Sequence, residues 1–328
     1  MILAGDIGGT KTVLALYEPE AGIERPLAEE LFVSDAHAAF EDVVSSFLST
    51  TGAKPTRASF GVAGPVIGGR SQITNLPWVI DAEALAARFE IPRVHLLNDL
   101  EAIAYAVPGL GAAHLHTLNP GRPAPGGTIA VVAPGTGLGV SFLAWTGTNY
   151  RPHATEGGHA SFAPATPEQI ELLAFMQHRF GHVSNERVCS GSGIPNLMDY
   201  VRSTGRYHEP DWLRKALSEA DDPTPVIVNT ALERSADACV AALDMFVRIL
   251  GGIVGNTALK LLTTGGIYLG GGIPPRILSR LQQADFLAAV RNKGRFADLV
   301  SNVPIHVILD PMAALHGAAR HALDQRDE

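Results

Sequence analysis

The fold class of this chain is decided by one stretch, Ile2-Leu3-Ala4-Gly5-Asp6-Ile7-Gly8-Gly9-Thr10-Lys11-Thr12-Val13-Leu14-Ala15-Leu16. Apolar runs at 2–4 and 13–16 flank the turn-forming Gly8-Gly9-Thr10, a pattern that predicts a β-hairpin. Because glycine has no Cβ, the tip of this hairpin can present backbone N–H groups to phosphate oxygens. Asp6 beside the tip suits a hydrated Mg²⁺. Taken alone, the same residues also fit a plain tight turn with a solvated or capping acid.

Residues 5–12 are superficially similar to a Walker P-loop. That motif needs a second glycine where this chain has Thr10, and it leads into a helix, whereas 13–16 has strand character. A Walker-type site is therefore not predicted.

A second glycine turn follows the same plan. The strand-like run 128–133 leads into Gly135-Thr136-Gly137-Leu138-Gly139, and the apolar run 140–145 follows. This repeat of strand, glycine turn and strand predicts a duplicated architecture with a ligand site between its halves. A dinucleotide fold would need Gly-x-Gly-x-x-Gly leading into a helix, which neither turn provides.

Strands and helices alternate after the first hairpin. Helical spacing at 38–48, strand character at 58–63, a helix capped by Asp81 and a short strand at 94–97 predict an α/β lobe. The second lobe is predicted to be mainly helical between 167 and 262.

Three further elements are expected near the end of the chain. A strand at 265–269 ends in Gly270-Gly271-Gly272, a second strand covers 304–309, and a last helix at 313–322 is predicted to pack back on the first lobe. The Pro- and Gly-rich segment 108–127 marks the lobe junction.

The length of 328 residues also favours two lobes. We predict a small α/β lobe at 1–109 plus 310–328 and a large α/β lobe at 110–309.

Composition limits the classes of partner. The formal charge is −8 and Lys and Arg do not cluster, which argues against nucleic-acid binding. The apolar segment 245–255 contains Arg248 and is shorter than the ~20 residues of a membrane span, so a buried helix is expected. Cys189 and Cys239 have no disulfide or zinc spacing, which predicts buried thiols, and no signal peptide is recognised, so a cytoplasmic protein is expected.

Polar residues at strand ends and in glycine-rich turns are the remaining candidates for chemistry. Asn98-Asp99 closes a short strand, where carboxylates in α/β folds reach ligands, although Asp99 also fits a helix N-cap. Glu156 and His159 could be two metal ligands, and Glu186 could belong to a capping box.

The chain resembles the bacterial glucokinases of the actin/hexokinase-like ATPase superfamily. Seven motifs, in family order, carry the resemblance: Asp6-Ile7-Gly8-Gly9-Thr10, Thr74-Asn75-Leu76-Pro77-Trp78, Leu97-Asn98-Asp99-Leu100-Glu101-Ala102, Gly135-Thr136-Gly137-Leu138-Gly139, Glu156-Gly157-Gly158-His159, Glu186-Arg187-Val188-Cys189-Ser190-Gly191 and Gly270-Gly271-Gly272-Ile273. It implies a two-lobed, ribonuclease H-like fold with an interlobe active-site cleft, ATP and Mg²⁺ as cofactors, no structural zinc, a hexose substrate, glucose above all, and a homodimer.

The resemblance also implies roles for individual residues. Asp99 is implied as the catalytic base. The sugar-binding residues would be Asn98, Asp99, Glu156, His159, Glu186 and Asn75; the nucleotide site would use Asp6, Gly8, Gly9, Thr10, Lys11, Thr12, Gly135, Thr136, Gly137, Gly271 and Gly272, with Asp6 holding Mg²⁺ through water. Two departures are Lys11, which leaves the phosphoryl donor open among ATP, ADP and polyphosphate, and Ser192, where the family has proline.

The division of these motifs between two lobes predicts closure over the sugar, which would keep ATP from being hydrolysed by water. A sugar-sensing regulator of the same fold would add a helix-turn-helix segment, for which the chain offers no room before Asp6. An actin- or chaperone-like ATPase would lack the set formed by Glu156, His159 and Glu186.

Overall fold

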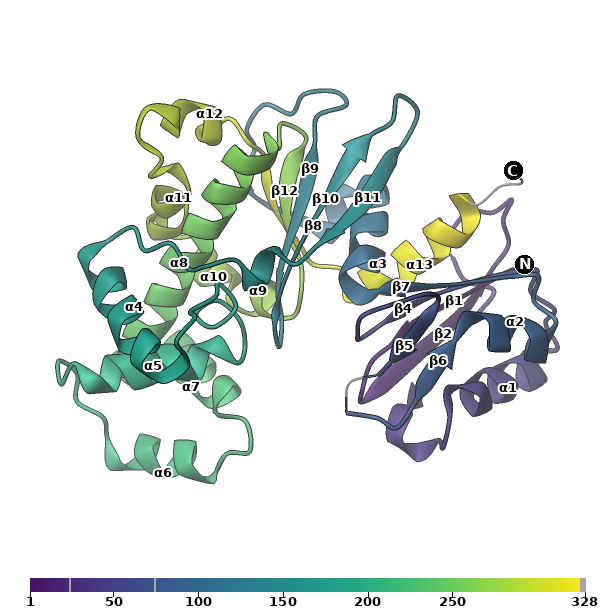
Figure 1. Ribbon diagram of the computed structural model, residues 1–328, viewed down its shortest axis with the longest axis horizontal. Coiled ribbons are helices and arrows are strands. Elements are labelled where there is room, and N and C mark those ends of the chain that lie inside the picture. Colours follow the sequence, from purple (N-terminus) through teal and green to yellow (C-terminus); the bar gives the residue numbers. More distant parts are fainter. Residues whose placement is uncertain (24, 74, 325–328) are drawn as a thin grey trace. The chain divides into compact units, whose positions relative to one another are not determined.

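The protein is described by a computed structural model that covers residues 1–23, 25–73 and 75–324. The chain forms two compact units (Figure 1). Unit 1 comprises Met1–Gly111, Arg151–His153 and Asp310–Glu328, and unit 2 comprises Ala112–Tyr150 and Ala154–Leu309. The division expected from the sequence differs in placing 110–111 and 151–153 in the second lobe, and its terminal residues 325–328 lie outside the described part of the chain.

A five-stranded sheet in the order β3-β2-β1-β4-β7 is the centre of unit 1. β1 and β2 form the predicted antiparallel hairpin, β2 and β3 are also antiparallel, and β4 is parallel to both β1 and β7. The strands of unit 1, including the small β5-β6 hairpin, are β1 (Ile2–Ile7), β2 (Lys11–Tyr17), β3 (Ala28–Val33), β4 (Arg57–Val62), β5 (Arg70–Gln72), β6 (Val79–Asp81) and β7 (Arg93–Asn98).

Helices cover both faces of this sheet. Leu3 and Ile7 of β1 lie in one core with residues of α1, whereas Ile2 and Ala4 lie in another core with residues of α13. Successive side chains of a strand point to opposite faces, so a continuously apolar strand suits a sheet covered on both sides. The helices of unit 1 are α1 (Phe40–Thr51), α2 (Ala82–Phe89), α3 (Asp99–Ala106) and α13 (Ala313–Asp324).

The last helix packs on the first unit, as predicted. α13 contacts α3, β1 and β4. Gly317 allows the close approach of α13 to α3, because a Cβ at this position would overlap the carbonyl oxygen of Ala102. The second local prediction is also confirmed: Asp81 caps α2, with its carboxylate accepting hydrogen bonds from the N–H groups of Glu83 and Ala84 at 2.9 and 3.1 Å.

Unit 2 repeats the strand order of unit 1. Its six-stranded sheet has the order β11-β10-β9-β12-β13-β8, in which the first five strands correspond to β3-β2-β1-β4-β7. β9 and β10 are antiparallel, and β12 is parallel to both β9 and β13. The duplication inferred from the two glycine turns is therefore confirmed in the topology. The strands are β8 (Leu115–Asn119), β9 (Ile129–Pro134), β10 (Leu138–Trp145), β11 (Tyr150–Thr155), β12 (Gly266–Leu269) and β13 (Ile305–Ile308).

The helical part of unit 2 surrounds α8. By length and composition α8 is the one helix of the described chain that could cross a membrane, but 72% of its most apolar stretch is buried inside the protein. It is thus the buried helix expected at 245–255, and Cys189 and Cys239 are buried and free. The helices of unit 2 are α4 (Pro167–Phe180), α5 (Gly193–Ser203), α6 (Asp211–Glu219), α7 (Pro223–Leu232), α8 (Asp237–Leu261), α9 (Ile273–Arg276), α10 (Leu278–Leu281), α11 (Ala284–Arg291) and α12 (Ala297–Ser301).

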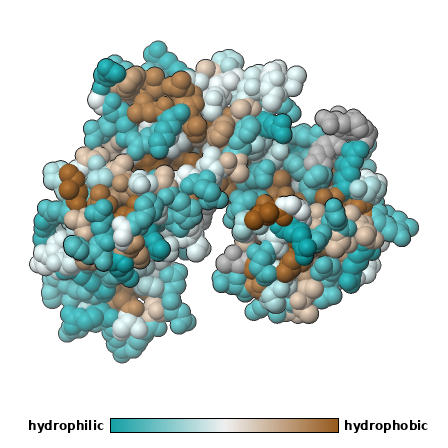
Figure 2. Space-filling model, viewed as in Figure 1, coloured by the Kyte–Doolittle hydropathy of each residue, from teal (hydrophilic) through white to brown (hydrophobic). Residues whose placement is uncertain are grey.

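Figure 2 shows a mostly hydrophilic face with apolar atoms gathered on unit 2 near α12. In that region Phe296 is 44% exposed and Leu299 is 36% exposed.

The α/β class predicted from the alternation of strands and helices is confirmed.

Candidate active site

The first glycine turn joins β1 to β2 in unit 1 and is held from outside by Ser34. The Gly8 N–H donates to the Lys11 carbonyl at 2.9 Å, which closes the turn. The Ser34 hydroxyl donates to the Gly8 carbonyl at 2.9 Å, and the Ser34 N–H donates to the Thr10 carbonyl at 3.0 Å. With its carbonyls occupied in this way, the turn has a defined shape. Ser34, which follows β3, was not recognised in the sequence because it belongs to no motif.

Lys11 and Thr12, both predicted to bind nucleotide, differ in accessibility. Lys11 is exposed and begins β2. Thr12 is completely buried, and its hydroxyl lies 3.0 Å from the Ser34 hydroxyl. In this conformation Thr12 therefore supports the turn through Ser34 and offers no surface to a ligand.

Asp6 and Asp99 place two carboxyl groups close enough to interact in unit 1. Asp6 is partly buried, and this burial, together with the negative charge of Asp99, raises its pKa to about 6. Asp99 is exposed as a residue, yet protein atoms around its carboxyl partly desolvate it and raise its pKa, while hydrogen bonds from Leu100, its own backbone and Asn98 oppose that rise. Two adjacent carboxylates of this kind fit a hydrated divalent cation, because a cation offsets their mutual repulsion.

We predict that Asp6→Asn stabilises the ligand-free protein at pH 7.5. The folded-state pKa of Asp6 lies above the ordinary value of 3.8, so its contribution to stability is full below pH 3.8 and is lost as the pH rises through about 6. Removing the charge should then add about 1–3 kcal/mol to the free energy of unfolding at pH 7.5 and under ~1 kcal/mol at pH 4.5.

Thermal unfolding at both pH values, without Mg²⁺ or nucleotide, measures this difference. Asp35→Asn is the control, because Asp35 is exposed and follows the edge strand of the same sheet. An equal shift at the two pH values would show that Asp6 is not a buried charge.

The N-cap of α3 is Asn98, so the alternative that made Asp99 the cap was wrong by one residue. The side-chain oxygen of Asn98 (Oδ1) accepts a hydrogen bond from the Leu100 N–H at 3.0 Å, and its side-chain amide donates to the Gly64 backbone carbonyl at 3.2 Å. Asp99 also accepts from the Leu100 N–H, at 2.8 Å. Asp99 is thus the first residue of α3, directly after β7. Hydrogen bonds from the backbone and from Asn98 set the orientation of its carboxyl group.

Asn75 lies in the turn between β5 and β6 with a left-handed backbone, φ 65°. Asparagine is one of the few residues that tolerate this conformation. The Ile73 N–H donates to the Trp78 carbonyl at 3.0 Å across the turn, and Asn75 itself is exposed. Thr74, the neighbouring residue of the same motif, lies outside the described residues.

The second glycine turn joins β9 to β10 in unit 2, where it contacts the segment that carries Glu186. The Gly191 N–H donates to the Gly135 carbonyl at 2.7 Å, and the Ser192 N–H donates to the Thr136 carbonyl at 3.2 Å. Because proline has no N–H, a proline at position 192 could not form the second bond. Ser192 therefore adds a second backbone hydrogen bond that holds the turn.

Glu186 is fixed against the end of the second glycine turn. One of its carboxylate oxygens accepts a hydrogen bond from the Leu138 N–H at 2.9 Å. That same oxygen would lie only 2.5 Å from a Cβ on Gly137, so any other residue at this position would displace the carboxylate. The capping-box alternative for Glu186 is wrong, because its carboxylate accepts from the Leu138 N–H and, among the described residues, the Ser184 hydroxyl accepts only from the Arg187 N–H.

Glu156 and His159 flank a short turn that is attached to Glu186 through the backbone. The Glu186 N–H donates to the Gly158 carbonyl at 2.9 Å. His159 Nε2 lies 3.9 Å from a Glu156 carboxylate oxygen, and both side chains are exposed, at 62% and 89%. No group of three or more His, Cys, Asp and Glu side chains that could hold a metal occurs in the described part of the chain, so the metal alternative for this pair gains no third ligand.

The third glycine cluster follows β12. Gly271 has a left-handed backbone, φ 78°, and a Cβ there would lie 2.6 Å from the Pro134 carbonyl oxygen, at the start of the second glycine turn. Gly272 is exposed, with no atom within 4 Å of a Cβ. The second glycine turn, the turn at Gly157-Gly158, the glycine cluster after β12 and Glu186 thus form one connected region of unit 2.

Comparison with known proteins identifies the family. The glucokinase family model matches residues 3–325. The chain belongs to the glucokinase family. The glucokinase of Nostoc punctiforme is 37% identical over 337 residues, covering 97% of this chain and 98% of that protein.

Two solved structures extend the comparison. A glucokinase from an Antarctic psychrotroph is 30% identical with a TM-score of 0.87 and 98% coverage of both chains. A ROK family glucokinase from Streptomyces griseus, solved with glucose and AMPPNP, has a TM-score of 0.63 at 19% identity, covering 98% of this chain and 99% of that one, and at this identity shows the fold alone.

Two residues that support the candidate site were not singled out in the sequence. The Ser190 hydroxyl donates to the Glu186 carbonyl at 2.7 Å and accepts from the Gly193 N–H at 2.9 Å. The Thr224 hydroxyl donates to the Gly191 carbonyl at 2.9 Å. Ser190 belongs to the motif at 186–191, so a supporting role could have been predicted from the sequence. Thr224 is 33 residues from its partner Gly191 and carries no local signal.

Proposed function

We propose that this protein transfers the γ-phosphoryl group of ATP to the 6-hydroxyl of glucose, forming glucose 6-phosphate for glycolysis in the cytoplasm. The observation that carries the proposal is the glucokinase match over nearly the whole chain. The glucose and AMPPNP in the Streptomyces griseus structure support the substrate and donor classes.

The proposed base is Asp99. A sugar hydroxyl must lose its proton as its bond to phosphorus forms, and a carboxylate is able to take it. Burial that raises the pKa of Asp99 makes the carboxylate a stronger proton acceptor than an ordinary aspartate. Asn98 is proposed to bind the sugar, since one of its amide hydrogens and one acceptor site remain after its bonds to Gly64 and Leu100.

Glu156, His159 and Glu186, with Asn75, are proposed to distinguish one hexose from another. A hydroxyl that loses a buried hydrogen-bond partner costs roughly 1–3 kcal/mol, enough to separate epimers. The Glu186 carboxylate is already oriented by the Leu138 N–H, which leaves its other oxygen for a sugar hydroxyl.

Nucleotide binding is proposed for Gly8, Gly9, Thr10 and Lys11 in unit 1 and for Gly135, Thr136, Gly137, Gly271 and Gly272 in unit 2. The glycines leave backbone N–H groups open to phosphate oxygens. When bound, Mg²⁺ would neutralise charge on the phosphates, and Asp6 would hold it through water. Thr12 is proposed to act only by supporting Ser34. A homodimer completes the proposal.

A coupled assay of the purified protein against a panel of hexoses and donors tests this function. We expect the highest kcat/KM with glucose and ATP. Absence of phosphorylation of any hexose with any donor would overturn the proposal. A preference for polyphosphate over ATP would show that polyphosphate is the phosphoryl donor, the possibility that Lys11 left open.

Replacing Glu156 with Gln is expected to raise the KM for glucose at least ~10-fold, about 1.4 kcal/mol, because an acceptor oxygen becomes a donor. The side chain is 89% exposed, so the thermal midpoint should not change. Steady-state kinetics with Glu219→Gln, an exposed glutamate of α6, as the control measure the effect. If Glu156→Gln instead lost bound metal and thermal stability, the alternative that Glu156 and His159 are metal ligands would be supported.

A further inference from the structure

A hollow in unit 2 is lined by none of the residues proposed for the sugar or nucleotide site. A cavity of about 240 Å³ is lined by residues from the 162–165 segment, α4, α8 and the end of α11. A second cavity of about 470 Å³ shares Ala165, Gln169, Gly252 and Asn292 with it. The two cavities adjoin at these residues and are together named here the α4–α8–α11 hollow.

Among the described residues that line the smaller cavity, Lys293 is the only charged one. Its ammonium has no ion pair or hydrogen bond with the described residues, and burial lowers its pKa. A partly buried cation without a counter-charge is costly unless an anion accompanies it. Uncompensated charge of this kind favours a negatively charged ligand.

Carboxamide groups line the same cavity as this lysine. Gln169, Asn185, Asn256 and Asn292 all line the cavity. Gln169 is only 5% exposed, and its carbonyl oxygen accepts from the Ala165 N–H at 2.8 Å, which leaves its amide hydrogens without an acceptor in the described chain. These donors suit the oxygens of a carboxylate or phosphate.

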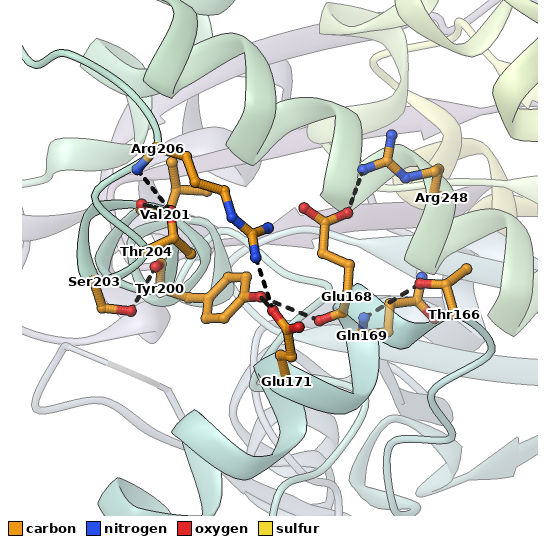
Figure 3. A network of polar contacts seen from close by, with 10 residues as sticks. All are labelled: Thr166, Glu168, Gln169, Glu171, Tyr200, Val201, Ser203, Thr204, Arg206 and Arg248. Atoms are coloured by element: carbon orange, nitrogen blue, oxygen red, sulfur yellow. Dashed lines mark hydrogen bonds and ion pairs between the residues drawn. The ribbon is translucent and has the colours of Figure 1, made fainter.

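The larger cavity adds a mixed set of charges. Arg248 lines it and pairs with Glu168 at 3.1 Å, next to the hydrogen bond between Gln169 and Thr166 that begins α4 (Figure 3). Arg291 and Asp285 also line this cavity. Among the described residues that line the hollow, three are cations and one is an acid, and the charge of one cation, Arg248, is already paired with Glu168.

Gly252 keeps the hollow open. Glycine inside a helix costs roughly 0.5–1 kcal/mol relative to alanine. Gly251 and Gly255 of α8 have a packing reason, because a Cβ on either would collide with the backbone of α11. A Cβ on Gly252 would have no atom within 4 Å and would enter the hollow that this residue lines. Packing thus explains two of the glycines but not Gly252.

We propose that the α4–α8–α11 hollow binds a small organic anion that carries a carboxylate or phosphate group. The charged group lies against Lys293, and the carboxamides bind its oxygens. Asn185, which lines the hollow, precedes the sugar-site candidate Glu186 and donates its N–H to the Ala160 carbonyl at 2.8 Å.

Calorimetric titration of the full chain, without sugar or nucleotide, tests the proposal with inorganic phosphate, glycerol 3-phosphate and pyruvate as probes. We expect at least one probe to bind with Kd at or below about 5 mM. Lys293→Met should weaken that binding at least ~10-fold by removing the charge-assisted contact. Lys260→Met, at an exposed lysine of α8, should leave it unchanged.

Gly252 provides a second, independent variant. Gly252→Leu keeps Lys293 but fills the hollow, so binding should be lost. Gly252→Ala should raise the thermal midpoint and weaken binding, which keeps the test decisive if the leucine variant does not fold. Absence of binding by every probe, or binding that survives both Lys293→Met and the Gly252 variants, would overturn the proposal. Because calorimetry needs no turnover, the result is independent of the proposed kinase activity.

Discussion

Asp99→Asn is expected to lower kcat for glucose phosphorylation at least ~10²-fold, about 2.7 kcal/mol of transition-state stabilisation. Asparagine keeps the size of the side chain and can accept the hydrogen bond that Leu100 N–H now donates at 2.8 Å, but it cannot take a proton. The helix should be unaffected, since the N-cap is Asn98. Glucose binding measured by calorimetry and the thermal midpoint should therefore change little.

The pH dependence provides a second readout of the same variant. A base must be ionised to act, so the acid limb of kcat/KM should lie above the ordinary aspartate pKa of 3.8, in the direction in which burial raises the pKa of Asp99. This limb should disappear in Asp99→Asn. Removing the charge of Asp99 should also lower the pKa of Asp6, because the negative charge of Asp99 helps to raise it.

Glu101→Gln is the matched control for this prediction. Glu101 lies in the same first turn of α3, and burial raises the pKa of its carboxyl too. If removing any partly buried carboxylate of this turn lowered kcat, both variants should show the loss. If Asp99 is the base, kcat should fall in Asp99→Asn alone. Retention of more than about a tenth of wild-type kcat by Asp99→Asn would refute the assignment of the base.

The second large effect is expected from Gly137→Val. The sequence alone predicts a rise in the KM for ATP with less effect on the sugar, because a β-branched side chain would obstruct a phosphate. The contact of 2.5 Å between a Cβ at this position and Glu186 changes that expectation. The carboxylate must move away and lose the bond to the Leu138 N–H, a charge-assisted bond of roughly 1.5–3 kcal/mol.

We therefore expect Gly137→Val to raise the KM for ATP and for glucose at least ~10-fold each. Gly135→Ala is the informative comparison, because a Cβ there has no protein atom within 4 Å and can disturb only an approaching phosphate. That variant should raise the KM for ATP and leave the KM for glucose close to wild type. Unchanged glucose kinetics in Gly137→Val would show that Glu186 does not bind the sugar from this position.

The prediction of the fold succeeded where neighbouring residues carry the information. The glycine hairpin of β1 and β2, the cap at Asp81 and the burial of α8 follow from turn chemistry, capping preference and periodicity, all of which act over a few residues. The repetition of one glycine turn predicted a duplication, and the repeated strand order of the two sheets agrees with it.

By itself the sequence determined the α/β class, the duplicated plan and, through motifs in family order, the glucokinase family. Only the tertiary structure decided that Ser34 holds the first glycine turn, that Thr12 is buried beneath it, and that Glu186 binds the Leu138 N–H 48 residues away. It also decided the raised pKa of Asp6, which depends on burial and on Asp99, 93 positions later in the chain. The physical reason is range: turns, caps and strand periodicity depend on adjacent residues, whereas hydrogen bonds across elements and the desolvation of a carboxyl group exist only after distant segments have packed together.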